Sequence, residues 1–248
     1  MNKKLIAVLL AALLLPALGR ASEENVHLDK ANIDVSDKAA LQRGAKYFVN
    51  YCLSCHSAKY MRYNRLVKDL DLTPEQVKQN LIMTNRKIGQ TMEVALRPVD
   101  GKKWFGNPPP DLSVIARQRG ADWLYTYLRS FYLDPSRPTG VNNVVFPKVA
   151  MPDVLWELQG WQEPVYKTVE LEDGQKEQVI DHLKLVAPGK MTPPQYDQMV
   201  RDLVTYLAYM GEPRQVLRKE MGVWVLLFLG LLFVVAYLLK KEYWKDLH

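Results

Sequence analysis

Two cysteines and a histidine stand together at Cys52-Leu53-Ser54-Cys55-His56, and their types and spacing carry specific chemistry. Thiols spaced as C-x-x-C and followed at once by histidine form the attachment pattern of a c-type haem. Each thiol bonds to one vinyl group of the same porphyrin. His56 would then lie under the iron as an axial ligand, because neutral imidazole binds haem iron well. The motif predicts one covalently bound haem c, with its iron held in part by His56.

A redox-active C-x-x-C pair and half of a zinc site are the alternatives for these cysteines. A redox pair belongs near a βαβ unit, and the sequence pattern contains none. A zinc site needs a second pair of ligands. The chain has only two cysteines, and its remaining histidines stand apart from one another at His27, His182 and His248. The spacing therefore favours haem attachment.

Residues 1–21 have the pattern of a secretory signal peptide. Lys3 and Lys4 precede an apolar run from Leu5 to Leu15, and small residues lead up to a cleavage site after Ala21. An uncleaved N-terminal anchor is the alternative, but the apolar run is short for a bilayer. Bacteria attach haem c outside the cytoplasmic membrane, so the signal and the haem motif support each other.

The other end of the chain predicts a membrane anchor at 218–240. Its central stretch, Met221–Leu239, has no charged residue. As a helix with about 1.5 Å of rise per residue it would reach roughly 28 Å, close to the thickness of the hydrocarbon core. A buried helix of a soluble protein is the alternative. Lysines and arginines flank both ends, so the positive-inside rule does not orient the span.

The signal peptide orients the chain instead. It predicts a periplasmic domain at 22–217, a single-pass anchor in the bacterial cytoplasmic (inner) membrane, and a cytoplasmic tail at 241–248. The formal net charge of +6 is modest and lies in large part beside the span, so a nucleic-acid-binding function has no support.

The domain at 22–217 is predicted to be mainly α. Ser36-Asp37 can cap a helix that runs to about Tyr51, directly before the haem motif. Gly44 would let another helix approach this one closely. The partner helix is expected at Pro194–Met210, between a proline pair and a glycine. A helix leading into C-x-x-C-H and crossed by a late helix resembles the class I cytochrome c fold.

Insertions fill the middle of the domain. Asp111 or Ser113 is expected to cap a helix that runs to about Gly120, and a second helix is expected at Asp122–Leu133. The residues from Asp134 to Gly140 predict a loop. Alternating residues between Val165 and Ile180 predict a small β-hairpin, with its turn at Glu172-Asp173-Gly174.

A thioether is the expected sixth ligand, because it suits haem iron and favours electron transfer over oxygen chemistry. Met151, in the step Met151-Pro152, and Met191, directly before the late helix, are the two candidates. Position before the last helix favours Met191 by analogy with small soluble cytochromes. Spacing alone leaves both open, because methionine is also a common core filler.

Several segments in order resemble the cytochrome c1 family. They are Cys52–Leu66, Asn107–Leu128, the Pro138-Thr139-Gly140-Val141 loop, the Met151-Pro152 step, the acidic hairpin and the C-terminal anchor. Cytochrome c1 is the haem subunit of ubiquinol–cytochrome c oxidoreductase, respiratory Complex III. The resemblance implies that Met151, rather than Met191, is the axial ligand.

The resemblance also implies further contacts to the haem. An arginine after the Pro-Pro-Asp-Leu-Ser run contacts a haem propionate, which by position is Arg119, with Arg117 as the neighbour that could take its place. Asn107, Pro109 and Pro110 would line the haem crevice. Mitochondrial members carry longer insertions and an acidic extension that this chain lacks, so their accessory contacts do not carry over.

The implied function is the passage of single electrons from the Rieske iron–sulfur protein to a soluble or membrane-tethered c-type cytochrome. The chain would count as an enzyme only as a subunit of the oxidoreductase, with no catalytic residue of its own. Cytochrome b and the lipid bilayer would contact the anchor. An acidic set on the hairpin could dock a basic cytochrome, or could simply be a solvated surface: Glu170, Glu172, Asp173, Glu177 and Asp181.

Three rival functions are distinguishable. A tethered monohaem cytochrome could serve another oxidase or reductase, and would not co-purify with cytochrome b and the Rieske protein. A haem enzyme or gas sensor would have an open sixth position and would bind carbon monoxide readily when reduced. A structural membrane subunit would leave the haem motif unexplained.

Overall fold

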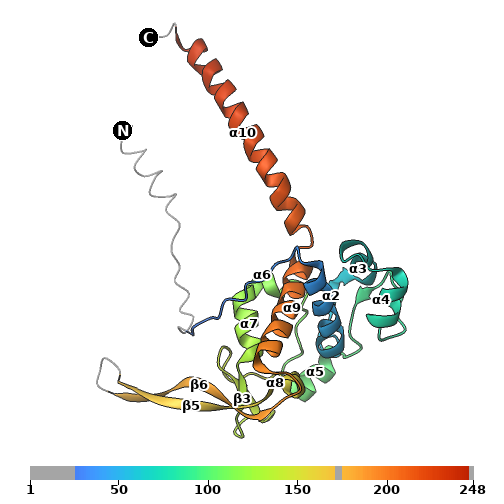
Figure 1. Cartoon of the computed structure of the whole chain (residues 1–248), viewed down its shortest axis with the longest axis vertical. Coiled ribbons are helices and arrows are strands. Elements are labelled where there is room, and N and C mark those ends of the chain that lie inside the picture. Colours follow the sequence, from blue (N-terminus) through green and yellow to red (C-terminus); the bar gives the residue numbers. More distant parts are fainter. Residues whose placement is uncertain (1–25, 171–174, 246–248) are drawn as a thin grey trace.

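The computed structural model describes residues 26–170 and 175–245. Within these residues the chain forms a mainly helical body, a β-hairpin that extends from one side, and a long C-terminal helix that leads away from it (Figure 1). The predicted signal peptide at 1–21 and the predicted hairpin turn at Glu172-Asp173-Gly174 lie outside the described residues.

Helix α2 (Lys38–Tyr47) continues into a single π-helical turn, η1 (Phe48–Cys52), which delivers the chain to the haem motif. The side chain of Asp37 caps α2 by accepting a hydrogen bond from the backbone N–H of Ala40. Helix α9 (Pro193–Gly211) begins with a capping box between Thr192 and Gln195. Both predicted helices are confirmed.

Helices α2 and α9 cross at Gly44. A Cβ atom at Gly44 would lie 2.1 Å from the backbone oxygen of Asp202 and 2.7 Å from the Cβ of Tyr206, so only glycine permits this approach. Beside the crossing, the Arg43 guanidinium forms two hydrogen bonds of 2.6 and 3.0 Å to the buried carboxylate of Asp202. The apolar stripe of α9 is buried at the crossing and beyond it: Tyr196, Met199, Leu203, Tyr206, Leu207 and Met210.

A set of short elements covers one side of this helix pair. Their bounds are β1 (Ala58–Arg62), α3 (Tyr63–Asp69), α4 (Pro74–Asn80), β2 (Thr91–Met92) and α5 (Pro98–Phe105). Strands β1 and β2 pair antiparallel. Helix α5 starts at a proline, whose missing N–H costs nothing at the first helical position, and is followed by Gly106 with φ +81°.

Helix α6 (Ile115–Arg119) is shorter than predicted, and neither expected residue caps it. The Asp111 carboxylate instead accepts hydrogen bonds from the N–H groups of Lys59 and Ser113. The hydroxyl of Ser113 accepts one from the N–H of Tyr60. Both side chains are committed to holding the segment after the haem motif, so the prediction of a cap at either position was wrong.

Helix α7 (Ala121–Arg129) ends earlier than the predicted Leu133. Residues Phe131–Leu133 form strand β3, which pairs antiparallel with β4 (Val141–Asn143). The predicted loop 134–140 connects the two strands. The strand pairing provides hydrogen-bond partners for the backbone groups of residues 131–133, so it competes with extension of the helix. A local sequence pattern does not reveal this pairing, because the partner strand lies beyond the loop.

After the short helix α8 (Trp156–Gln159), the predicted hairpin is present and longer than expected. Strands β5 (Gly160–Glu170) and β6 (Lys176–Pro188) pair along their whole length. Gly160 has φ +95°, and a Cβ atom there would lie only 2.2 Å from the backbone oxygen of Ala187. Only glycine therefore permits the close strand pairing at the end of the hairpin that joins the helical body. Most of the outer part is exposed.

Helix α10 (Gln215–Tyr243) contains the whole predicted span and begins three residues before it. None of its residues is buried in the body. Within the described part of the chain it is the one helix whose length and composition suit a membrane span.

Candidate haem-binding site

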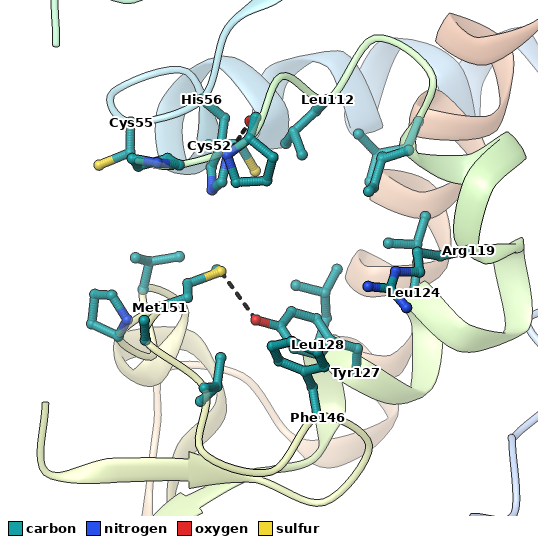
Figure 2. A pocket seen from close by; sticks show the side chains of 18 of the residues that line it. Cys52, Cys55, His56, Leu112, Arg119, Leu124, Tyr127, Leu128, Phe146 and Met151 are labelled. Atoms are coloured by element: carbon teal, nitrogen blue, oxygen red, sulfur yellow. Dashed lines mark hydrogen bonds between the residues drawn. The ribbon is translucent and has the colours of Figure 1, made fainter. Parts of the chain in front are cut away.

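A cavity of about 360 Å³ lies between the C-x-x-C-H segment and the segment that carries Met151 (Figure 2). Its walls are mainly apolar. They come from η1, from residues 105–112, from helices α6 and α7, from residues 146–154 and from the buried face of α9. Leu203 and Leu207 of α9 lie among them, so the α2–α9 crossing also forms the back of the cavity.

The cysteines reach the cavity on a tight turn. The N–H groups of Cys55 and His56 both donate to the carbonyl of Cys52, at 3.1 and 2.8 Å. Both thiols are free, and both residues line the cavity. Burial raises the pKa of the Cys52 thiol to about 12, so that thiol is protonated at neutral pH.

His56 is oriented by a backbone carbonyl. Its Nδ1 lies 2.8 Å from the Pro110 oxygen, and because a carbonyl only accepts, Nδ1 carries the donated proton. That leaves Nε2 as the basic nitrogen. Burial lowers the pKa of His56, partly offset by the bond to Pro110, and keeps the ring neutral. A neutral imidazole whose second nitrogen is fixed in this way is the usual arrangement of a histidine metal ligand.

Met151 lies on the wall opposite His56 (Figure 2). The Tyr127 hydroxyl donates a hydrogen bond to the Met151 sulfur, with 3.3 Å between oxygen and sulfur. Met191 does not line this cavity. It packs against the hydrophobic core, and its N–H donates to the Leu158 carbonyl at 3.0 Å. The structure thus brings Met151, and not Met191, to face the histidine.

The other predicted site residues lie at the same cavity. Asn107, Pro109 and Pro110 line it, as does Arg119. In the described part of the chain the guanidinium of Arg119 contacts aromatic rings, at 5.0 Å from the ring centre of Trp123 and 5.8 Å from that of Phe146. The neighbouring candidate, Arg117, lies instead against Gly211 at the end of α9.

Sequence reasoning missed one polar group at this site and a second one close to it in the chain. Tyr127 belongs to an apolar helix face on which its hydroxyl carried no distinguishing signal. Asp153, two residues after Met151, is buried and accepts a hydrogen bond from the N–H of Leu155 at 3.0 Å. Burial raises the pKa of its carboxyl to about 6.

The donor set fits a haem. A mainly apolar slot holds two thiols on one wall, and an oriented imidazole and a thioether face each other across it. These are the groups needed for two thioether links and two axial bonds. A guanidinium on the wall of the same slot suits a carboxylate such as a propionate.

Comparison with known proteins points the same way. The family model described as "Cytochrome C1 family" matches residues 29–103 and 101–247. The chain is 53% identical to the cytochrome c1 of Allochromatium vinosum over the full length of both. It is 52% identical to a Nitrosomonas europaea protein named ammonia monooxygenase gamma subunit, over 97% of each chain. It is 26% identical to a cytochrome c1 of Rhodobacter capsulatus, covering 98% of this chain and 97% of that one.

Proposed function

The chain belongs to the cytochrome c1 family, and on this premise we propose how its residues carry out electron transfer. It is the membrane-anchored haem subunit of a ubiquinol–cytochrome c oxidoreductase. The observation that carries the proposal is the apolar cavity with an oriented imidazole and a thioether on opposite walls.

Cys52 and Cys55 would form the thioether links to one haem c, and His56 and Met151 would hold its iron. The group supplies a reversible one-electron iron couple when bound. His56 and Met151 would hold the group from opposite walls, and the apolar side chains that line the cavity would keep water away from it. No residue of the chain acts as an acid, base or nucleophile, so the enzyme label belongs to the whole complex.

Arg119 would pair with a propionate of the bound haem. Its place at the cavity supports this assignment, and its guanidinium is held over Trp123 and Phe146 rather than by a carboxylate of the described chain. A planar guanidinium can bind a carboxylate through two parallel hydrogen bonds. Asn107, Pro109 and Pro110 close the crevice, and the Pro110 carbonyl additionally fixes His56.

The Rieske iron–sulfur protein delivers the electron, and a soluble or membrane-tethered c-type cytochrome removes it. The haem domain lies in the periplasm, α10 crosses the cytoplasmic membrane beside cytochrome b, and the tail lies in the cytoplasm. We assign the haem domain to the class I cytochrome c fold. The close crossing of α2 and α9 at Gly44, directly before the haem motif, supports this.

The hairpin is a solvated surface rather than a docking site for a basic cytochrome. Of the five acidic residues considered for docking, Glu172 and Asp173 lie outside the described residues. Of the others, Asp181 forms an ion pair with Lys167 at 2.8 Å, and Glu170 lies opposite Lys176 in the strand register. Local pairing of this kind reduces the field available to a partner.

Replacing each candidate methionine by leucine in the holoprotein tests the ligand set. In Met151→Leu we expect loss of low-spin character, a lower midpoint potential and ready binding of carbon monoxide. Met191→Leu is the matched control and should keep the native spectrum. Loss of low-spin character in Met191→Leu with a native Met151→Leu spectrum would overturn the assignment.

Co-purification tests the partners. The protein, extracted from its native membrane in mild detergent, should elute with cytochrome b and the Rieske protein. Elution with a different oxidase or reductase would instead support the tethered monohaem cytochrome.

A further inference from the structure

The hydroxyl of Tyr127 makes a contact that neither the sequence motifs nor the family assignment explains. It points across the cavity wall to the Met151 sulfur, with the 3.3 Å separation of a hydrogen bond to sulfur (Figure 2). Methionine has three rotatable side-chain bonds and adapts easily to its surroundings. A fixed donor on the thioether therefore restricts an otherwise adaptable group.

The ring of Tyr127 is itself held on two sides. It stacks on Trp123 with 4.9 Å between ring centres and 10° between planes. It meets Phe131 edge-on at 5.1 Å. The backbone carbonyl of Tyr127 also accepts a hydrogen bond of 2.8 Å from the side chain of Asn143. The hydroxyl position is thus set by a ring with little freedom.

The hydroxyl has its partner inside the protein. Tyr127 is buried, which limits the contact of its hydroxyl with bulk water. The sulfur of Met151 is the acceptor that the structure assigns to it. A thioether has two lone pairs, so it can bind iron with one and accept this hydrogen bond with the other.

We propose that Tyr127 is a positioning residue that fixes the Met151 thioether and raises the reduction potential of the haem. This inference rests on the proposed role of Met151 as axial ligand. A hydrogen bond withdraws electron density from the sulfur, which weakens its donation to ferric iron more than to ferrous iron. The oxidised state is therefore destabilised relative to the reduced state. The positive end of the hydroxyl dipole, which faces the site, acts in the same direction.

The test uses the haem-loaded full-length protein with Tyr127→Phe, which keeps the ring and its stacking. We expect the haem to stay low-spin. Its equilibrium constant for electron exchange with a redox mediator should shift three- to tenfold toward the oxidised haem. This corresponds to a midpoint potential lower by about 30 to 59 mV. The sulfur-to-iron charge-transfer band of the ferric protein should shift or weaken as well.

Tyr125→Phe is the matched control. Tyr125 is buried on the same helix, but its ring lies under the guanidinium groups of Arg129 and Arg201, at 4.6 and 5.9 Å, instead of at the cavity. Its loss of a hydroxyl should leave the potential and the charge-transfer band unchanged. A native potential in Tyr127→Phe, or an equal shift in Tyr125→Phe, overturns the proposal.

A second variant keeps the test open if Tyr127→Phe assembles poorly. Fluorotyrosine at position 127 has a more acidic phenol and donates a stronger hydrogen bond, so the midpoint potential should rise. A purely structural role predicts no rise, and that result overturns the proposal. The Met151→Leu spectrum separates the two hypotheses. A native spectrum in Met151→Leu means that Met151 is not the ligand, so the proposed function fails. A changed spectrum in Met151→Leu together with a native potential in Tyr127→Phe overturns only the role of Tyr127.

Discussion

Replacing Gly44 by alanine should push apart the two helices that form the back of the haem cavity. The added Cβ would lie 2.1 Å from the Asp202 backbone oxygen, 2.7 Å from the Tyr206 Cβ and 2.8 Å from the Asp202 carbonyl carbon. Two of these atoms belong to the backbone of α9 and cannot rotate away. The helices must therefore separate by roughly 1 Å or more to restore van der Waals contact.

The loss of folding free energy in Gly44→Ala follows from two opposing effects. Overpacking a well-packed core costs about 1–3 kcal/mol and sometimes more, and the rigid backbone contact places Gly44→Ala at the upper end. Alanine recovers about 1 kcal/mol because glycine is a poor helix former. We expect a net loss of about 2 kcal/mol or more, which lowers the melting temperature of a domain of this size by about 4–8 °C.

The assay is thermal unfolding of the detergent-solubilised holoprotein, followed both by haem absorbance and by far-ultraviolet circular dichroism. Gly89→Ala is the control, because a Cβ at Gly89 would meet nothing within 4 Å. A lower yield of haem-loaded protein should accompany the lower stability of Gly44→Ala, since α9 supplies Leu203 and Leu207 to the cavity. A Gly44→Ala protein that melts with the wild type would refute the reasoning about this crossing.

Three further changes probe the supports around the site. Asp202→Ala should lower the free energy of unfolding by about 1–3 kcal/mol in urea titrations, because Arg43 loses its buried partner but can still reach water. Hydrogen bonds from Lys30 and from the N–H of Ala31 lower the pKa of the Asp122 carboxyl. The stability contributed by the ionised Asp122 carboxyl is therefore fully present above its pKa in the unfolded chain, near pH 4, and is lost as the pH falls through the lowered pKa of the folded protein. Amide exchange at Ala31 should quicken over that pH window. In Asp122→Asn it should already be faster at neutral pH. A chain ending at Arg214 should enter the aqueous phase of a detergent partition with its haem spectrum intact, because no residue of α10 is buried in the body.

The sequence predicted those parts of the fold that depend on local signals. Asp37 caps α2 as expected, and the proline pair and Gly211 delimit α9 within one residue of the predicted ends. Gly44 was recognised as a close-approach position because glycine has few other reasons to stand inside a helix. The C-x-x-C-H motif predicted the cysteines and the histidine that line the cavity, because all three are adjacent in the chain.

Features set by distant partners escaped the same reasoning. Phe131–Leu133 reads as helix locally, but pairing with Val141–Asn143 makes it a strand. Asp111 has the type and place of a helix cap, yet its carboxylate binds the N–H of Lys59, 52 residues earlier in the chain. Spacing could not decide between Met151 and Met191, because both precede structural turns and only the folded chain brings one of them opposite His56.

The two proposed iron ligands are contacted by different kinds of group, a backbone carbonyl at His56 and a side-chain hydroxyl at Met151, and this difference governs how each ligand can be adjusted. On the histidine side, the backbone carbonyl of Pro110 accepts from His56, and the carbonyl of Ser57 accepts from the N–H of Leu112 at 2.8 Å, while the Asp111 and Ser113 side chains also hold the segment after the haem motif. Substituting side chains leaves the two carbonyl acceptors in place.

On the methionine side the supports are side chains. Asn143 accepts from the N–H groups of Val145 and Phe146, at 2.9 and 3.1 Å, and so shapes the loop that leads to Met151. Tyr127 then contacts the sulfur itself. One substitution at position 127 or 143 can therefore change the thioether without disturbing the histidine. We accordingly expect the reduction potential of this haem to be more sensitive to changes on the methionine wall than to changes of similar size around Pro110.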